Sequence, residues 1–280
     1  MTIKRILLAH GGLEDQQVGL ATALELARQF EAEVEVFHAI TDSRDAVAFV
    51  GEGMTSAMIE GVIAMAEKDA AERRVRARKY FDEARSSAAP ELQGRLEFVE
   101  HVGREDELVG AHGRMFDLIV AARPSGETSA SKQLTLEAAL QETGRPVLIV
   151  GASKPKIADA RIAIFWNGSV ESCKAITAAL PFLRVASGVV LFSVNVSADN
   201  GLTAADAVRY LAAHGITATH KEIDEGGRAT GDALIDKAQQ CGAELLVMGA
   251  FTHSRLRRLI FGAVTGAVIE GSPIAALMIH

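Results

Sequence analysis

Short apolar segments alternate along the chain with longer segments in which apolar residues recur every three or four positions. The first pattern is typical of buried strands, and the second of amphipathic helices. In the first part of the chain, strands are expected at Ile3–Ala9, Val34–Ile40, Leu96–Val102, Leu118–Ala122 and Val147–Val150. Helices are expected between them at Asp15–Phe30, within Met54–Ala88, just before Met115 and near Lys132–Glu142.

The same order of segments then recurs, so the chain is a tandem repeat. One offset of 127 aligns Val120 with Val247 and Pro146 with Pro273, which matches the last strand-helix-strand units without a gap. Ile6 aligns with Ile162 at an offset of 156, and the longer second helix of the first half accounts for most of the difference. The second set of strands is expected at Ile162–Trp166, Val189–Val194, Ile216–Ile223, Leu245–Met248 and Ile274–Ile279, and its helices at Val170–Leu183, Ala204–His214, Asp232–Gln240 and Leu256–Glu270.

This alternation predicts the α/β class. Each helical crossover returns the chain to the same edge of a sheet, so consecutive strands run parallel, and near-continuous apolar strands suit a sheet covered on both faces. We therefore expect two tandem Rossmann-like domains, residues 1–152 and 161–280, each a doubly wound five-stranded parallel sheet. Ser153–Asp159 is the expected linker.

Composition narrows the classes of function. The 29 Lys and Arg residues against 36 Asp and Glu residues give a net charge of −7, which argues against binding to nucleic acid or to an anionic membrane. No apolar stretch reaches the ~18 residues of a membrane span, and the first residues lack the apolar region of a signal peptide. The only cysteines, Cys173 and Cys241, form no CxxC pair, which fits a cytoplasmic protein with unpaired thiols.

Ligands of open parallel sheets bind beyond the carboxyl ends of the strands. Only the loop after Met248 is distinctive there. Gly249 and Gly262 allow close approach of backbone N–H groups, the following helix begins with unpaired donors, and Arg255 adds a cation, so the loop is a candidate phosphate cradle. Alternatively, Gly249 makes a turn, Gly262 permits close helix packing, and the arginines form a solvated helix face.

The spacing of this loop resembles the G-x-x-G-x(9)-G-[ST] nucleotide signature of the universal stress protein family, and the tandem plan resembles its two-domain members over essentially the whole chain. Two further stretches are similar to that family: 164–169 (IFWNGS) to its first strand and Asp-Gly-Ser turn, and 179–183 (ALPFL) to the end of its first helix.

The resemblance implies the strand order 3-2-1-4-5 in each half, and two halves packed about a pseudo-twofold axis through their last strands. It also implies an adenine nucleotide, ATP or AMP, with the base and ribose near the first-strand turn and the second strand's end and the phosphates on the glycine loop. The residues implied for this site are Asn167, Gly168, Val194, Gly249, Thr252, His253, Ser254, Arg255, Gly262, Ala263 and Val264.

Three positions depart from the family's pattern. Asn167 stands for an Asp and adds amide donors where a carboxylate only accepts. Thr252 stands for the second Gly, and a β-branched residue at positive φ would be strained by roughly 1–3 kcal/mol. Ala263 stands for the Ser or Thr and lacks a hydroxyl worth about 1 kcal/mol. His253, Ser254 and Arg255 are the residues that could compensate.

The first half departs further. Ala122, Ser125, Thr135 and Leu136 stand at its signature positions, Pro124 lacks a backbone donor, and Gly11 stands where the second half has Asn167. We expect this half to bind no nucleotide and to serve as a packing partner.

The eight histidines form no metal-binding motif, and no Gly-x-Ser-x-Gly elbow is present, so the sequence predicts neither a metal site nor covalent catalysis. We expect a stress-response protein that binds an adenine nucleotide in its second half as a regulatory ligand, with at most very slow ATP hydrolysis. The alternative is a protein of the same fold that acts as a scaffold or binds another small molecule. The two halves can cover each other as an intramolecular pseudo-dimer, which allows a monomer; a homodimer is preferred.

Overall fold

A computed structural model describes residues 2–40, 55–126, 129–194, 202–251 and 262–280. In the first half the strands are β1 (Arg5–Ala9), β2 (Glu33–Ile40), β3 (Leu96–Val102), β4 (Leu118–Ala122) and β5 (Val147–Val150). Its helices are η1 (Glu14–Gln16), α1 (Gln17–Phe30), α3 (Ser56–Ser87), α4 (Pro90–Gln93), α5 (Glu105–His112), η2 (Gly113–Met115) and α6 (Ser129–Glu142).

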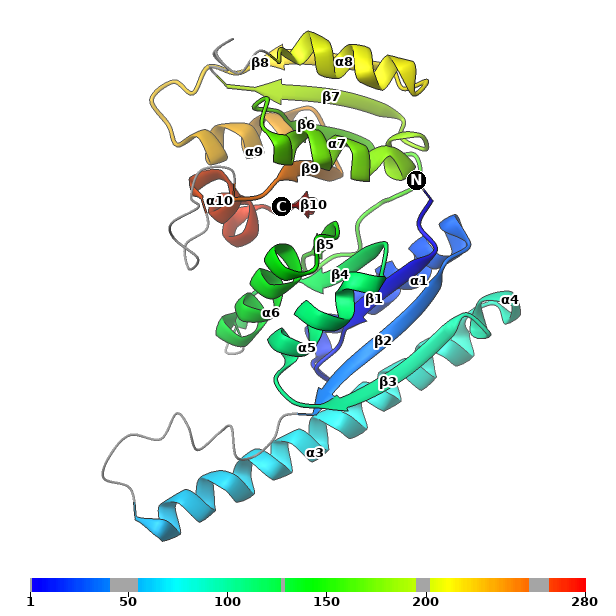
Figure 1. Cartoon of the computed structure of the whole chain (residues 1–280), viewed down its shortest axis with the longest axis vertical. Helices are drawn as coiled ribbons and strands as arrows, with labels where there is room; N and C mark the ends of the chain where they lie inside the picture. Colours follow the sequence, from blue (N-terminus) through cyan, green and yellow to red (C-terminus); the bar gives the residue numbers. More distant parts are fainter. Residues whose placement is uncertain (1, 41–54, 127–128, 195–201, 252–261) are drawn as a thin grey trace.

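The second half repeats this order (Figure 1). Its strands are β6 (Arg161–Phe165), β7 (Gly188–Ser193), β8 (Ala218–Glu222), β9 (Leu245–Gly249) and β10 (Ala275–Ile279). Its helices are α7 (Val170–Leu183), α8 (Ala204–Ala213), α9 (Thr230–Gln240) and α10 (Ala263–Gly271). The helix expected over Leu256–Glu270 is described only from Ala263 onward, with Gly262 as its N-cap.

All ten strands form one sheet in the order β3-β2-β1-β4-β5-β10-β9-β6-β7-β8. Each half therefore has the order 3-2-1-4-5, as the family resemblance implies. Every neighbouring pair is parallel except β5 and β10, which pair antiparallel with Leu148 opposite Leu277. Because the halves run in opposite directions, their carboxyl edges lie on opposite sides of the sheet.

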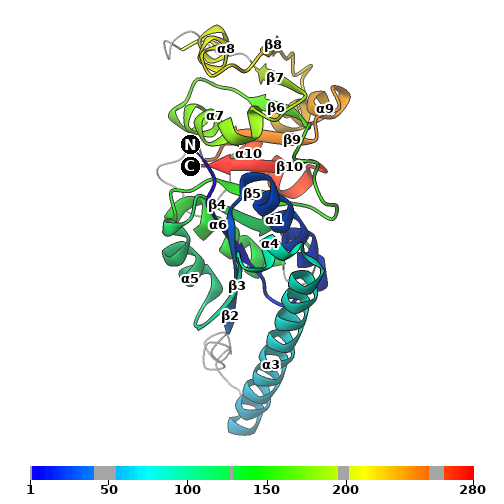
Figure 2. The ribbon, with the colours of Figure 1, turned by 90° about the vertical axis from the view of Figure 1, so that its right-hand side faces the viewer.

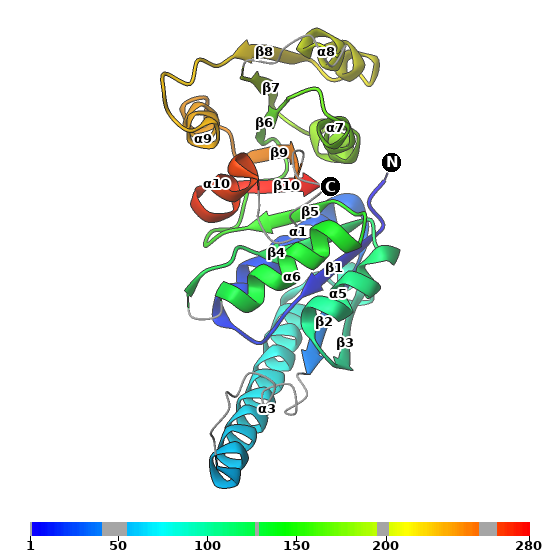
Figure 3. The same cartoon turned by 60° about the vertical axis from the view of Figure 1, so that its left-hand side comes forward.

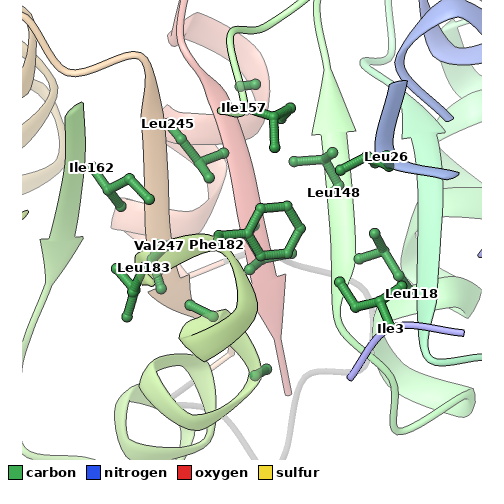
Figure 4. Close-up of a cluster of buried hydrophobic side chains, with 14 of the residues drawn as sticks. Ile3, Leu26, Leu118, Leu148, Ile157, Ile162, Phe182, Leu183, Leu245 and Val247 are labelled. Carbon is green, nitrogen blue, oxygen red and sulfur yellow. The ribbon is translucent and has the colours of Figure 1, made fainter. Parts of the chain in front are cut away.

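Helices cover both faces of this sheet (Figure 3). Residues of α1, α3, α7 and α8 are buried on one face, and residues of α5, α6, α9 and α10 on the other. Figure 4 shows Leu148, Ile157 and Phe182 lying together over the junction of the halves. There Phe182 of α7 also meets Phe30 of α1 edge-on, with ring centroids 5.4 Å apart. One continuous apolar core therefore joins the halves.

The last strand of the second half is displaced along its neighbour relative to the first half. In the first half, Ile119 of β4 pairs with Val147 of β5. The residue 127 positions after Ile119 is Leu246 of β9. It pairs with Ala276 of β10, which is 129 positions after Val147. The alignment without a gap is therefore wrong for the last strand. A displacement of two residues keeps every side chain on its own face of the sheet, so the hydrophobic pattern did not reveal it.

Helix α3 extends from the body at its Ser56 end (Figure 2). Only Ala77 and Phe81 of this helix are fully buried. Ion pairs at i,i+4 spacing lie along its solvated face, with Asp69 and Arg73 2.7 Å apart and Glu72 and Arg76 3.6 Å apart. Within the residues described above, no helix is both long and apolar enough to span a membrane.

Candidate functional site

The carboxyl ends of β9, β6 and β7 lie side by side at one edge of the sheet. Gly249 is the last residue of β9, Asn167 follows β6 after Trp166, and Val194 directly follows β7. The backbone N–H of Trp166 donates to the Phe192 carbonyl at 2.8 Å, which extends the contact between β6 and β7 beyond the strands. The structure thus brings these three predicted site residues to the same edge.

The turn after β6 fixes Asn167 and begins α7. Gly168 has φ +74°, which favours glycine. The Ser169 backbone N–H donates to Asn167 Oδ1 at 3.2 Å, and Ser169 Oγ accepts from the Ser172 N–H at 3.1 Å as the N-cap of α7. Asn167 is exposed, so its side-chain carbonyl serves the turn while its amide N–H groups stay available to a ligand.

Gly249 has a structural reason to be glycine. A Cβ at this position would lie 2.6 Å from the Glu171 carbonyl carbon and 2.8 Å from the Ser172 nitrogen. Strand β9 can therefore approach the first turn of α7 only without a side chain here. This close contact differs from the turn that the sequence offered as the alternative, and a ligand role for Gly249 stays a prediction.

Gly262, in contrast, faces no described side chain closely. A Cβ there would meet no atom of the described residues within 4 Å, and its φ of −58° and ψ of 153° suit any residue. No side chain caps α10 within the described segments. Ala263 is exposed and Val264 half-buried, so no described residue covers the first amides of α10, and this helix N-terminus is a favourable place for an anion. The close helix packing considered for Gly262 is absent among the described atoms.

Thr252, His253, Ser254 and Arg255 lie outside the described residues, so their part in the site stays a prediction. The residue before them, Phe251, has φ +62°, which is unusual for a bulky side chain. Positive φ thus occurs one residue before the position that the family signature gives to glycine.

The end of β10 supports Phe251. The His280 ring meets the Phe251 ring edge-on, with centroids 5.4 Å apart, and His280 Nδ1 lies 3.1 Å from the Ala250 carbonyl oxygen. Lys174 Nζ of α7 donates to the His280 carbonyl at 3.3 Å. These contacts hold the start of the loop against β10 and α7, and Lys174 and His280 are neighbours of the site that the sequence analysis missed.

In the first half, side chains of the chain itself occupy the corresponding edge. Gln16 Oε1 accepts from the backbone N–H groups of Gly11 at 2.7 Å and Leu13 at 3.3 Å. Gly12 has φ +75°, and a Cβ there would lie 2.2 Å from the Arg73 carbonyl oxygen of α3. The turn amides are therefore occupied and α3 lies directly on the turn.

The strand-four connection of the first half is helical where the signature requires a loop. Thr135 and Leu136 lie inside α6, and Leu136 is fully buried. Thr135 Oγ1 donates to Glu105 Oε1 at 2.9 Å. Burial raises the pKa of Glu105, while the Thr135 hydrogen bond opposes that shift. Lys132 forms an ion pair with Asp15. These contacts support, without testing it, the prediction that this half binds no nucleotide.

His10 and Trp166 occupy corresponding positions after the first strand of each half, and both are buried. His10 Nδ1 accepts from the Gly12 N–H at 3.2 Å. His10 Nε2 and Trp166 Nε1 have no hydrogen-bond partner within the described chain. Burial, and secondarily the charge of His38, lowers the pKa of His10 to about 4. Trp166 belongs to the buried apolar core. The repeat offset of 156 aligns His10 with Trp166, and this alignment is the signal that could have identified His10 as a residue at the corresponding edge.

The described residues contain no group of three or more His, Cys, Asp or Glu side chains able to hold a metal ion. Cys173 is half-buried, and burial together with Glu171 raises the pKa of its thiol. A raised thiol pKa disfavours the reactive thiolate.

A profile of the universal stress protein family matches residues 161–280. No curated protein sequence matches the chain. Among solved structures, a universal stress protein from Archaeoglobus fulgidus DSM 4304 superimposes with a TM-score of 0.68 at 15% identity, covering 98% of this chain and 97% of that one.

Two proteins from Pseudomonas aeruginosa also superimpose over nearly the whole chain. One, from strain PAO1 and of unknown function, has a TM-score of 0.59 at 12% identity and covers 99% of this chain and 92% of its own. The other, from strain UCBPP-PA14, has a TM-score of 0.60 at 12% identity and covers 99% and 93%. At these identities the likeness shows the fold.

Proposed function

We propose that residues 161–280 bind an adenine nucleotide, ATP or AMP, as a regulatory ligand in a tandem universal stress protein. The observation that carries the proposal is the uncovered N-terminus of α10 at Gly262–Val264, within the segment that matches the family profile. Its amide donors and partial positive charge suit phosphate oxygens. Asn167 and Val194, at the neighbouring strand ends of the same half, are the proposed contacts of the nucleoside.

The bound nucleotide is proposed to act by occupancy, with no turnover or only very slow hydrolysis. Turnover requires a group placed to activate water or to stabilise the leaving phosphate. The residues proposed around the nucleotide include no carboxylate that could act as a base, and His253 and Arg255 are the only titratable members of the set. We therefore expect hydrolysis of the bound nucleotide to be very slow at most.

Titration of the single tryptophan tests binding directly. Trp166 is buried immediately before Asn167, so a nucleoside at this edge should change its fluorescence. Thermal unfolding gives an independent measure, because a ligand at about 100 times its dissociation constant stabilises a protein by about 2.7 kcal/mol. No change in fluorescence or melting temperature at millimolar ATP and AMP would contradict the proposal.

A second candidate function is that of a scaffold, or of a binder of another small molecule, with the same fold. The replacements at Thr252 and Ala263 and the occupied edge of the first half favour it. Native mass spectrometry of the purified protein separates the candidates, because it shows any carried ligand by mass. It also tests the proposed homodimer.

The proposed stoichiometry is one nucleotide per chain. In the first half the Gln16 side chain occupies the turn amides, and α6 occupies the phosphate loop's position. Isothermal titration calorimetry should therefore give one site per chain, and two sites would contradict the assignment of the first half as a packing partner.

A further inference from the structure

Arg123 follows β4 in the first half but makes its side-chain contacts in the second. Its Nη1 donates to the Val268 carbonyl and, at 2.7 Å, to the Ile269 carbonyl, and its Nη2 donates to the Ile274 carbonyl at 2.9 Å. Val268 and Ile269 belong to α10, and Ile274 directly precedes β10. One guanidinium therefore joins the end of α10 to the start of the strand that follows it.

The last four carbonyls of a helix have no partner within the helix, and the Ile269 carbonyl cannot gain one from residue 273, which is proline and has no N–H. The Val268 carbonyl also accepts from the Ser272 N–H at 3.4 Å, and the Ile274 carbonyl from Ser272 Oγ at 3.1 Å, so Arg123 is a second donor to these two. All three residues that Arg123 contacts are buried. Among the described residues no carboxylate pairs with Arg123. Burial lowers the pKa of its guanidinium, which nevertheless stays charged at neutral pH. A cation at this end also complements the dipole of α10.

Among the described residues, the contact has no counterpart in the opposite direction. Position 250 corresponds to 123 at the offset of 127, and it holds alanine, whose side chain cannot donate. Within the described part of the chain, the first half thus holds a helix of the second, whereas the second does not hold α6 in the same way. The loop of the first half that departs from the nucleotide signature therefore contacts the opposite half.

The other end of α10 is the N-terminus to which we assign the phosphates. The helix has nine residues, so its ends are roughly 13 Å apart. A short helix fixed at one end cannot tilt or slide without displacing the other. Where Arg123 holds Val268 and Ile269, it therefore also limits the positions open to the amides of Ala263 and Val264.

We propose that Arg123 is a positioning residue for the phosphate site of the opposite half, acting through α10. This inference rests on the proposed nucleotide binding. It gives the first half a definite role, which is to set the position of the helix whose N-terminus receives the anion.

The test compares Arg123→Gln and Arg123→Lys with Arg184→Gln, a control at the exposed C-cap of α7. Affinities for ATP and for adenosine are measured by Trp166 fluorescence. Arg123→Gln should weaken ATP binding about fivefold or more, a usual size for coupling between sites, and leave adenosine affinity unchanged. Arg123→Lys should restore part of the loss, and Arg184→Gln should match the parent. An unchanged ratio of ATP to adenosine affinity in Arg123→Gln would overturn the inference.

Hydrogen exchange on the ligand-free protein keeps the two proposals separable. Arg123→Gln should speed exchange along α10 as far as Gly266, whose N–H donates to the Gly262 carbonyl at 2.8 Å in the first turn, whereas Arg184→Gln should not. If exchange rises only in the last turn, the helix does not transmit the contact and the inference fails. A parent protein that binds neither ATP nor adenosine would refute the proposed function, and exchange at Gly266 would still decide whether Arg123 positions the helix. Thermal unfolding of each variant establishes that it is folded.

Discussion

Of the two described glycines of the signature, only Gly249 should resist replacement by alanine. In Gly249→Ala the new Cβ would lie 2.6 Å from both the carbonyl carbon and the Cβ of Glu171, about 1 Å closer than an ordinary carbon contact. The atoms in the way include backbone of the first turn of α7, so a side-chain rotation cannot relieve the clash. Overpacking of this kind costs about 1–3 kcal/mol.

Gly262→Ala is the matched control. Its Cβ meets no atom of the described residues, and its backbone angles suit alanine. Alanine is a poorer N-cap than glycine by roughly 0.5–1 kcal/mol, and the stiffer unfolded chain offsets about 0.4–1 kcal/mol of that loss. We therefore expect a net change close to zero.

Thermal unfolding followed by circular dichroism, without ligand, measures both variants. At roughly 2–4 °C for each kcal/mol in a chain of this size class, Gly249→Ala should melt about 2 to 12 °C below the parent. Gly262→Ala should melt at the temperature of the parent. If Gly249→Ala melts with the parent, or Gly262→Ala falls as far, the packing role assigned to Gly249 is wrong.

Three further predictions concern the junction of the halves, the first-half edge and the loop. Leu148→Ala removes a fully buried side chain opposite Leu277 and should lower the free energy of unfolding by about 2–5 kcal/mol in urea denaturation; a loss below 1 kcal/mol would mean that the junction contributes little. Because His10 is buried with a pKa of about 4, below the usual 6.5, the unfolded chain binds the extra proton as pH falls from about 6.5 to 4. The stability that His10 contributes above pH 6.5, about 3 kcal/mol, should be lost across that interval, and His10→Gln should flatten the pH dependence; an equally steep profile in the variant would exclude His10. Arg255→Ala should weaken ATP binding in the fluorescence titration without lowering the melting temperature, and equal affinity in variant and parent would remove Arg255 from the site.

The sequence by itself determined the α/β class, the repeat and most element boundaries. Leu96–Val102, Leu118–Ala122, Val147–Val150 and Val170–Leu183 were predicted with the bounds that the structure has. These features depend on the spacing of apolar residues along the chain, which is a local property. The strand order 3-2-1-4-5 came from the family resemblance, and the observed order of strands within each half of the single sheet confirms it.

The packing of the elements settles what lies against each residue at the carboxyl edges of the two halves. The close approach of Gly249 to α7, the occupation of the Gly11 amide by Gln16 and the reach of Arg123 to Val268 join groups whose meeting depends on how the elements pack. Hydrophobic periodicity indicates which face of an element is buried, but it does not indicate which residues of other elements contact that face. For the same reason it could not detect the two-residue displacement of β10, since every side chain keeps its face when a strand moves by two.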